Sequence, residues 1–287
     1  MEYTTLISVQ DLQHHLNDPD WLIVDCRFDL DKPDWSQSAY HEAHIPGAVY
    51  VDLDHDLTAP MDGFNGRHPL PSVQDMSALF SRIGINESTQ VVAYDDAGGP
   101  FAARLWWSLR FLGHDAAAVL DGGIDAWKRE GFPMRSGRED RPSSTFQPAP
   151  RPGMLIKAEQ VLANLEDADV LLLDSRSPER YRGEQEPRDP VAGRIPGARN
   201  RFWQDNLDTE GRFKPSEILK DEFETQLAGA APENVIVYCG SGVTASHNML
   251  ALEHAGIHGT RLYAGSWSEW CADSSRPIAS GSPSEHS

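Results

Sequence analysis

The chain has 287 residues, of which 39% are hydrophobic and 24% are charged, and its formal net charge at pH 7 is -19. No apolar run approaches the roughly 20 residues that a membrane-spanning helix needs, so the composition indicates a globular protein that stays in water. The negative charge, without any Lys/Arg cluster, argues against nucleic acid and anionic membranes as partners.

The N-terminus and the cysteines indicate a reducing compartment. Residues 1–20 lack the basic start, apolar core and cleavage site of a secretory signal. The three cysteines, Cys26, Cys239 and Cys271, show no CxxC spacing, which argues against a disulfide framework and a structural zinc site. We therefore expect a cytoplasmic protein, and we assign it no metal and no other cofactor.

Short runs of β-branched residues alternate with longer segments of helical period along the chain. The predicted elements, in chain order, are helix 8–16, strand 21–25, strand 91–94, helix 103–112, helix 158–165, strand 170–174, strand 235–238 and helix 244–255. This alternation predicts the α/β class, with mostly parallel sheets that are covered by helices on both faces.

The two halves of the chain resemble each other at four places in the same order. The matching pairs are "LIVDCRFD" (22–29) with "LLLDSRSP" (171–178), "HIPGAV" (44–49) with "RIPGAR" (194–199), "VVAYDD" (91–96) with "VIVYCG" (235–240), and "GGIDAW" (122–127) with "GSWSEW" (265–270). Four ordered matches indicate a duplication, so we expect two similar α/β domains.

The domain boundary is predicted where composition changes. Residues 137–153 are rich in Pro, Ser, Gly and charge and lack apolar periodicity, as in an exposed linker. We therefore divide the chain into an N-terminal domain at 1–136, a C-terminal domain at 154–275 and a tail at 276–287, to which we assign no chemistry.

Cys239 lies where chemistry is expected in a parallel α/β domain, directly after a strand and before a helix. In "CGSGVT", Gly240 and Gly242 let the backbone curl so that its N–H groups point inward, and the helix that follows adds its positive end. Such a loop favours a negatively charged, nucleophilic thiolate. We interpret Cys239 as catalytic, and Cys26 and Cys271 as packing residues.

Other motifs give weaker evidence for a catalytic, metal-binding or phosphate-binding site. Asp95 occupies the place of the cysteine in the first half, so we expect only the C-terminal domain to react. "HEAH" (41–44) spaces its histidines three apart, not four, and "DDAGGP" (95–100) lacks the lysine of a phosphate-binding P-loop. Asp25 and Asp174 end predicted strands and are interpreted as structural anchors.

The duplicated "HIPGA" and "RIPGA", the loop "CGSGVTA" and the late "GSWSEW" together resemble the tandem-domain rhodanese-type sulfurtransferases, over nearly the whole chain. The resemblance implies two rhodanese-like domains, the first of them inactive. The loop is similar to that of the 3-mercaptopyruvate sulfurtransferase branch, because thiosulfate sulfurtransferases more typically carry basic residues after the cysteine. Here Gly240 and Ser241 follow Cys239.

The resemblance implies a two-step reaction with a small anionic sulfur donor. The Cys239 thiolate would take the sulfur of 3-mercaptopyruvate as a persulfide, releasing pyruvate, and would pass it to a thiol, cyanide or a reduced, thioredoxin-like protein dithiol. Backbone N–H groups of the loop residues Gly240, Gly242, Val243 and Thr244 would stabilise the persulfide charge.

The family's substrate-carboxylate arginines correspond to Arg180 in "SPERYRG" and Arg188 in "EQEPRDP". An arginine fork can bind a carboxylate with two parallel hydrogen bonds. The two residues are eight apart, one fewer than in the family pattern, which weakens the match for Arg188.

The resemblance also implies a relay of Ser241, His68 in "GRHPLP" and Asp54 in "VDLDHD". A hydroxyl that is polarised by histidine and aspartate could donate a proton to the enolate of the leaving group. The alternative for His68 is an ordinary exposed histidine in a loop.

The cysteine loop is compatible in outline with three other functions. A phosphatase of the Cys-x5-Arg type would require arginine at position 245, where the chain has Ala245. Thiosulfate sulfurtransferase activity on the same scaffold stays open, and so does a role as a carrier of persulfide sulfur between proteins.

Overall fold

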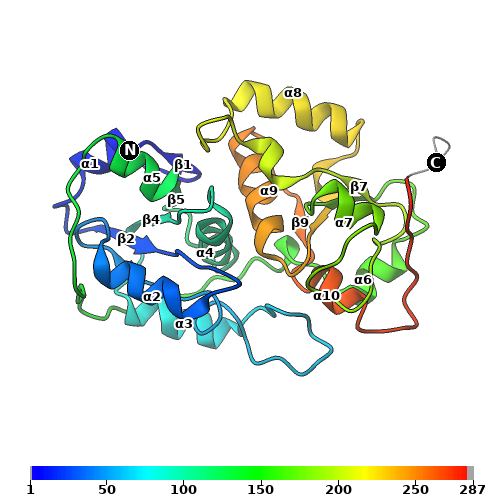
Figure 1. The fold of residues 1–287 in the computed structure, drawn as a ribbon, viewed down its shortest axis with the longest axis horizontal. Coiled ribbons are helices and arrows are strands. Elements are labelled where there is room, and N and C mark those ends of the chain that lie inside the picture. The colour runs from blue at the N-terminus through cyan, green and yellow to red at the C-terminus, as the bar shows by residue number, and fades with distance from the viewer. Residues whose placement is uncertain (1, 283–287) are drawn as a thin grey trace. The chain divides into compact units, whose positions relative to one another are not determined.

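The computed structural model describes residues 2–282, so residues 283–287 of the predicted tail lie outside the described residues. The chain forms two compact units (Figure 1). Unit 1 comprises Met1–Ala59, Pro71–Arg151 and Thr209–Phe213, and unit 2 comprises Pro60–Leu70, Pro152–Asp208 and Lys214–Ser287. The predicted division placed residues 60–70 in the N-terminal domain and residues 209–213 in the C-terminal domain. In the structure, residues 60–70 belong to unit 2 and residues 209–213 belong to unit 1.

Unit 1 is built on a five-stranded sheet in the order β1-β5-β4-β2-β3. Its strands are β1 (Leu6–Ile7), β2 (Trp21–Asp25), β3 (Val49–Tyr50), β4 (Gln90–Tyr94) and β5 (Ala117–Leu120), and its helices are α1 (Val9–His14), α2 (Pro33–Glu42), α3 (Val73–Arg82), α4 (Pro100–Phe111) and α5 (Gly123–Arg129). Every residue of β4 is buried, which explains its unbroken apolar run, because a central parallel strand is covered on both faces.

Unit 2 has a four-stranded sheet in the order β7-β6-β8-β9. Its strands are β6 (Leu171–Asp174), β7 (Arg199–Asn200), β8 (Val235–Tyr238) and β9 (Arg261–Leu262). Its α-helices are α6 (Ala158–Ala163), α7 (Pro178–Arg182), α8 (Ser216–Leu227), α9 (Val243–His254) and α10 (Ser266–Trp270). Its short 3-10 helices are η1 (Pro152–Met154), η2 (Trp203–Asn206) and η3 (Pro232–Asn234). All the ladders between named strands in both sheets are parallel. The predicted α/β class is confirmed.

The duplication is visible in matched buried networks. In unit 1, Arg27 Nη2 and Tyr94 OH donate to the same oxygen of Asp25, at 2.6 and 2.7 Å. In unit 2, Arg176 Nη2 donates to Asp174 at 2.7 Å. The two aspartates also accept the N–H groups of Arg27 and Arg176, each at 3.0 Å. They anchor the chain after β2 and β6, as the sequence suggested.

The segment predicted as a linker runs along unit 1. The Ser144 N–H donates to the carbonyl of Ser81, and the Ala149 N–H donates to the carbonyl of Leu112, each at 2.8 Å. Phe146 is buried. Although most of its side chains are exposed, as predicted, the segment is tied down by its backbone.

The described part of the tail is also held in place. Ala279 exchanges two backbone hydrogen bonds with Arg194, at 2.8 and 3.0 Å. No helix within residues 2–282 is long and apolar enough to cross a membrane. In the same residues, no group of three or more His, Cys, Asp or Glu side chains is placed to hold a metal ion.

Candidate active site

Cys239 lies at the carboxyl end of β8, an interior strand of the unit 2 sheet. The chain turns within three residues and enters α9 through Gly242, which has a φ of 80°. This left-handed conformation strongly favours glycine. The thiol is therefore delivered to the N-terminus of a helix by a loop that depends on Gly242.

The cysteine is held from two sides. The Gly242 N–H donates to Cys239 Sγ at 3.1 Å, and the Cys239 N–H donates to Ser266 Oγ at 3.0 Å. The Trp267 N–H donates to the carbonyl of Cys239 at 3.0 Å. Thus α10, which begins at Ser266, fixes the backbone of Cys239 while the loop supplies a donor to its sulfur.

Ser266 adopts a backbone conformation that is unusual for its type. Its φ is 56°, and a non-glycine residue in the left-handed region costs about 1–2 kcal/mol. The hydroxyl accepts from Cys239 and donates to the carbonyl of Tyr263 at 2.9 Å. Sequence reasoning missed Ser266, because nothing in "GSWSEW" signals a positive φ at serine.

Ser241 and His68 are brought together. His68 Nδ1 and Ser241 Oγ share a hydrogen bond of 2.7 Å, and each residue is 6% exposed. The alternative of an exposed loop histidine is therefore wrong. Asp54 belongs to unit 1, where its N–H donates to Asp52 Oδ1 at 2.8 Å. Its part in a relay stays a prediction.

Arg180 lies on α7 and faces the reactive loop. A Cβ atom on Gly240 would lie 3.2 Å from Arg180 Nη2 and 2.8 Å from Arg67 Nη2. The Arg180 guanidinium also binds Glu186, with Nη2 2.7 Å from Oε1, and Asp189, with Nη2 3.3 Å from Oδ2. The Arg180 guanidinium therefore lies beside the cysteine loop. Its role in binding the donor carboxylate stays a prediction.

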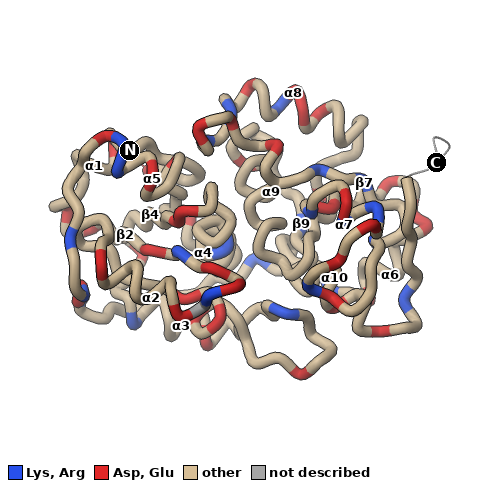
Figure 2. The backbone as a smooth tube through the Cα atoms, viewed as in Figure 1, with Lys and Arg blue, Asp and Glu red and all other residues tan. Residues whose placement is uncertain are grey.

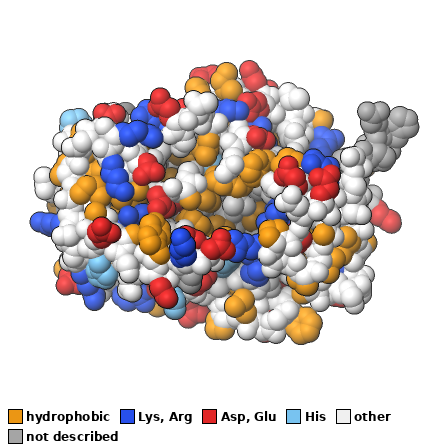
Figure 3. Space-filling model, in the orientation of Figure 1, with side chains coloured by type: hydrophobic (Ala, Val, Ile, Leu, Met, Phe, Trp, Pro, Cys, Tyr) orange, Lys and Arg blue, Asp and Glu red, His pale blue; other side chains and the backbone are white. Residues whose placement is uncertain are grey.

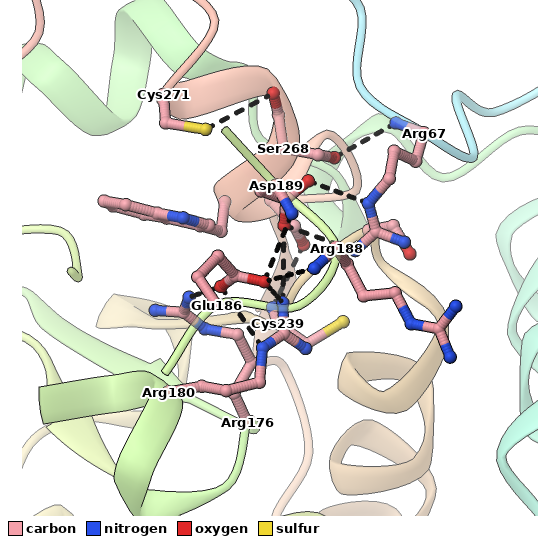
Figure 4. A network of polar contacts seen from close by, with 12 residues as sticks. Arg67, Arg176, Arg180, Glu186, Arg188, Asp189, Cys239, Ser268 and Cys271 are labelled. Atoms are coloured by element: carbon pink, nitrogen blue, oxygen red, sulfur yellow. Dashed lines mark hydrogen bonds and ion pairs between the residues drawn. The ribbon is translucent and has the colours of Figure 1, made fainter. Parts of the chain in front are cut away.

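Arg188 is placed differently. Its N–H donates to Glu186 Oε1 at 3.1 Å. Figure 4 shows its side chain directed away from the carboxylates of Glu186 and Asp189. The three atoms nearest to a Cβ on Gly240 belong to Arg67 and Arg180. A direct role of Arg188 in donor binding stays a prediction.

Arg67 and Asp189 form a pair that sequence reasoning missed. Arg67 Nε and Nη2 donate to the two oxygens of Asp189, at 2.8 and 3.3 Å, and the Arg67 N–H donates to Ser268 Oγ at 3.0 Å. The only hint in the sequence is that each residue is next to a predicted site residue: Arg67 precedes His68, and Asp189 follows Arg188. This hint does not indicate that Arg67 and Asp189 form an ion pair with each other.

A network of ion pairs lies beside the loop at Gly240. Arg67, Arg176 and Arg180 each lie within hydrogen-bond distance of a carboxylate, that of Asp189 or Glu186 (Figure 4). Figure 2 shows that acidic and basic residues are interspersed along the chain. The side chains of Glu186 and Asp189 are 3% and 2% exposed, whereas that of Arg67 is 26% exposed. The two carboxylates lie inside, whereas Arg67 and Arg180 are partly open to solvent. Partly exposed guanidinium groups suit an anionic donor in an otherwise acidic protein. The surface in Figure 3 mixes both signs of charge.

The other two cysteines lie in different surroundings. Burial, followed by the charge of Asp25, raises the pKa of Cys26 well above its ordinary value. Burial, followed by the charge of Asp189, raises the pKa of Cys271 to about 11. Both thiols are therefore protonated at neutral pH and poor nucleophiles.

The matching loop of unit 1 is filled by its own carboxylate. Asp95 is 1% exposed. Its Oδ1 accepts the N–H groups of Ala97 and Gly99, at 2.9 and 2.8 Å, and its Oδ2 accepts those of Phe101 and Ala102, at 2.9 and 3.0 Å. This loop holds an internal anion at the N-terminus of α4.

Known proteins resemble this chain along its whole length. A family model described as "Rhodanese-like domain" matches residues 8–130 and 157–273. A probable 3-mercaptopyruvate sulfurtransferase of Pseudomonas aeruginosa is 46% identical over 283 residues, which cover 98% of this chain and 100% of that protein. A putative thiosulfate sulfurtransferase of Mycobacterium tuberculosis is 37% identical over 269 residues, which cover 90% of each chain.

A solved structure agrees with these sequence matches. The 3-mercaptopyruvate sulfurtransferase from Leishmania major superposes with a TM-score of 0.84 at 28% identity, over 96% of this chain and 76% of that chain. The two segments that match the family model fall in the two halves of the duplication, so the expectation of two rhodanese-like domains is confirmed.

Proposed function

The chain belongs to the family of rhodanese-like sulfurtransferases, and we propose that it transfers sulfur from 3-mercaptopyruvate, through a persulfide on Cys239, to a thiol acceptor. The proposal depends above all on the placement of the Cys239 sulfur, which accepts the Gly242 N–H at 3.1 Å in front of α9. Donors that point at a sulfur stabilise both a thiolate and the persulfide that replaces it.

In the first step, the Cys239 thiolate attacks the sulfur of 3-mercaptopyruvate. A sulfur–sulfur bond forms, the carbon–sulfur bond of the donor breaks, and the electron pair of that bond leaves on the pyruvate enolate. The thiol proton of the donor ends on the enolate carbon, which yields pyruvate and leaves a negatively charged persulfide. An acceptor thiolate or cyanide then takes the outer sulfur and restores the Cys239 thiolate.

Arg180 is proposed to hold the donor carboxylate. Its guanidinium lies against Gly240, one residue after the nucleophile, and its side chain is 19% exposed. A carboxylate bound there is held close to the thiolate, which converts a collision between two anions into a reaction within one complex. Arg188 is retained as a second candidate from the family pattern.

Ser241 and His68 are proposed to move the proton. The hydrogen bond of 2.7 Å between His68 Nδ1 and Ser241 Oγ lets the imidazole polarise the hydroxyl. Ser241 lies two residues after Cys239, so its hydroxyl is suited to protonate the enolate as the carbon–sulfur bond breaks. Asp54 is retained as the third member of this relay on the family pattern alone.

Unit 1 is proposed to carry no sulfur, because Asp95 replaces the cysteine and occupies the donors of its own loop. We also retain a cytoplasmic location and a reduced protein dithiol as the natural acceptor. Cys26, Cys239 and Cys271 are all free in the structure, which fits a reducing compartment.

The proposal is tested by pyruvate release from 3-mercaptopyruvate, with dithiothreitol and reduced thioredoxin compared as acceptors. We expect saturable turnover that Cys239→Ser abolishes and Cys271→Ser leaves unchanged. Turnover that survives Cys239→Ser would overturn the mechanism. Fast transfer between proteins, without turnover of the small donor, would indicate a sulfur carrier instead.

A further inference from the structure

Arg67 stands at the same place as Arg180 and comes from a separate part of the chain. Its Nη2 atom would lie 2.8 Å from a Cβ on Gly240, which is closer than either terminal nitrogen of Arg180. Gly66, with a φ of 87°, lets this segment approach α10 so closely that a Cβ there would lie 2.9 Å from the carbonyl of Gly265. Backbone packing therefore sets the position of Arg67.

The guanidinium of Arg67 is fixed in direction and open to solvent on one side. Asp189 holds it with two hydrogen bonds, at 2.8 and 3.3 Å, yet a quarter of the side chain, 26%, is exposed. The Asp189 side chain itself is only 2% exposed. An anion that arrives at the loop therefore meets the arginine before it meets the carboxylate.

Arg67 contributes one positive charge to the network of ion pairs beside the loop. Three guanidinium groups and three carboxylates are joined by ion pairs: Arg67, Arg176 and Arg180 with Asp174, Glu186 and Asp189. Without Arg67, the five side chains that remain would carry one excess negative charge, and Asp189 would keep only its ion pair with Arg180 at 3.3 Å. The energy of that charge with a dianion is twice its energy with a monoanion at the same distance.

We propose that Arg67 is a second cation of the donor site and that it enables the enzyme to use thiosulfate, a dianion, as a donor beside 3-mercaptopyruvate. This inference rests on the proposed function of Cys239. Gly240 and Ser241, the residues after the cysteine, carry no charge, so Arg67 supplies from a distant segment a cation that the loop itself lacks.

The thiosulfate reaction uses the same nucleophile. The Cys239 thiolate attacks the outer sulfur of thiosulfate, a sulfur–sulfur bond forms to the cysteine, and the sulfur–sulfur bond of the donor breaks. The electron pair of that bond leaves on sulfite, a dianion. Because both the donor and the leaving group carry two negative charges, a cation beside Gly240 acts in the ground state and after bond cleavage. No proton transfer is required.

The test compares kcat/KM for the two donors with cyanide as the common acceptor and thiocyanate as the product measured. We expect Arg67→Gln to lower the thiosulfate value about tenfold more than the 3-mercaptopyruvate value. Arg67→Lys keeps the charge and should retain most of the thiosulfate activity. Added salt should reduce thiosulfate turnover more in the unmodified enzyme than in Arg67→Gln.

Arg182→Gln is the matched control. Arg182 lies on the same helix as Arg180, but its side chain binds the exposed Glu184, with Nε 2.7 Å from Oε1. Its removal takes the same charge from unit 2 and should leave the ratio of the two donors unchanged. An equal loss with both donors in Arg67→Gln, or a shift of the donor ratio in Arg182→Gln as large as that in Arg67→Gln, would overturn the role of Arg67.

The outcome also separates this inference from the function on which it rests. A Cys239 persulfide that forms with 3-mercaptopyruvate but not with thiosulfate overturns the thiosulfate activity and leaves the proposed function standing. A Cys239 that accepts sulfur from neither donor overturns both.

Discussion

The loops that follow β4 and β8 start from equivalent strands and differ in the anion that each presents to a helix N-terminus. In unit 1, the carboxylate of Asp95 accepts four backbone N–H groups and is buried. In unit 2, Cys239 Sγ accepts one, from Gly242. The first loop is filled by a side-chain carboxylate of its own, whereas the second keeps its donors for the sulfur that is transferred.

The comparison also indicates where the transferred sulfur lies. A carboxylate oxygen of Asp95 is two bonds from Cβ, and the outer sulfur of a Cys239 persulfide is also two bonds from Cβ. Asp95 Oδ2 accepts the N–H groups of the second and third residues of α4. The corresponding residues of α9 are Thr244 and Ala245, so we expect their N–H groups to face the outer sulfur.

The helices α5 and α10, whose first residues lie against the two loops, differ at that first residue. Gly123 has a φ of 58°, and a Cβ there would lie 2.2 Å from the carbonyl of Asp95, so unit 1 requires glycine. Ser266 has nearly the same φ, 56°, and uses its side chain to accept the Cys239 N–H. In unit 2, the backbone strain at Ser266 is therefore offset by a hydrogen bond between its side chain and the backbone of Cys239.

Cys239→Asp gives the unit 2 loop the carboxylate that the unit 1 loop carries at Asp95. A carboxylate cannot carry sulfur, so we expect complete loss of turnover. We also expect a Tm at or above that of Cys239→Ser, because the carboxylate can reach the N–H groups of Thr244 and Ala245. Calorimetry and the pyruvate assay on both variants check this. A Tm several degrees below that of Cys239→Ser would show that the unit 2 loop does not bind an anion as unit 1 does.

Ser241→Ala separates sulfur transfer from proton transfer. Without the hydroxyl beside His68, we expect kcat with 3-mercaptopyruvate to fall by about 10²–10³-fold, since general acid catalysis contributes that much. Thiosulfate needs no proton, so its turnover should change far less. The ratio of the two rates is the measurement, and equal losses with both donors would assign Ser241 to the shape of the loop instead.

Asp95→Asn is the converse change in unit 1. The amide can accept only through its oxygen, so N–H groups now bound to Asp95 Oδ2 lose their acceptor. We expect the free energy of unfolding to fall by about 1–3 kcal/mol, while kcat of the folded enzyme stays the same. Urea unfolding followed by assays well below the transition checks both parts. A large loss of kcat without a loss of stability would give unit 1 a role in the reaction.

The reactivity of Cys271 should depend on pH. Because the pKa of Cys271 is raised to about 11, its alkylation should be slow at pH 8 and rise about tenfold per pH unit up to that value. The folded state binds this proton more tightly than the unfolded chain does. The contribution to stability is therefore complete below about pH 8.5 and is lost as the pH rises to 11. Peptide mapping after iodoacetamide treatment across this pH range measures the rate at Cys271.

The fold was largely predictable because its signals are local. The run Val235–Tyr238 is apolar and β-branched and became β8 without change of bounds. The duplication added a second, independent copy of each signal. Predicted helices were displaced at their ends, and α4 begins at Pro100, three residues before the predicted start. Helix ends depend on caps such as Gly99, which apolar periodicity does not detect.

The site was predictable only where one segment carries the chemistry. Cys239 stood out because a strand, two glycines and a helix surround it. Arg67 and Asp189 did not, because their ion pair joins residues 122 positions apart. Their meeting depends on segment 60–70 packing into unit 2, which no pattern in that segment reveals.

The most direct measurement is the mass of the protein after one turnover with 3-mercaptopyruvate and no acceptor, followed by mapping of the modified peptide. The account predicts a gain of one sulfur atom on the peptide that contains Cys239, and its loss on addition of cyanide. A gain on Cys26 or Cys271, or release of pyruvate with no sulfur bound to the protein, would contradict it.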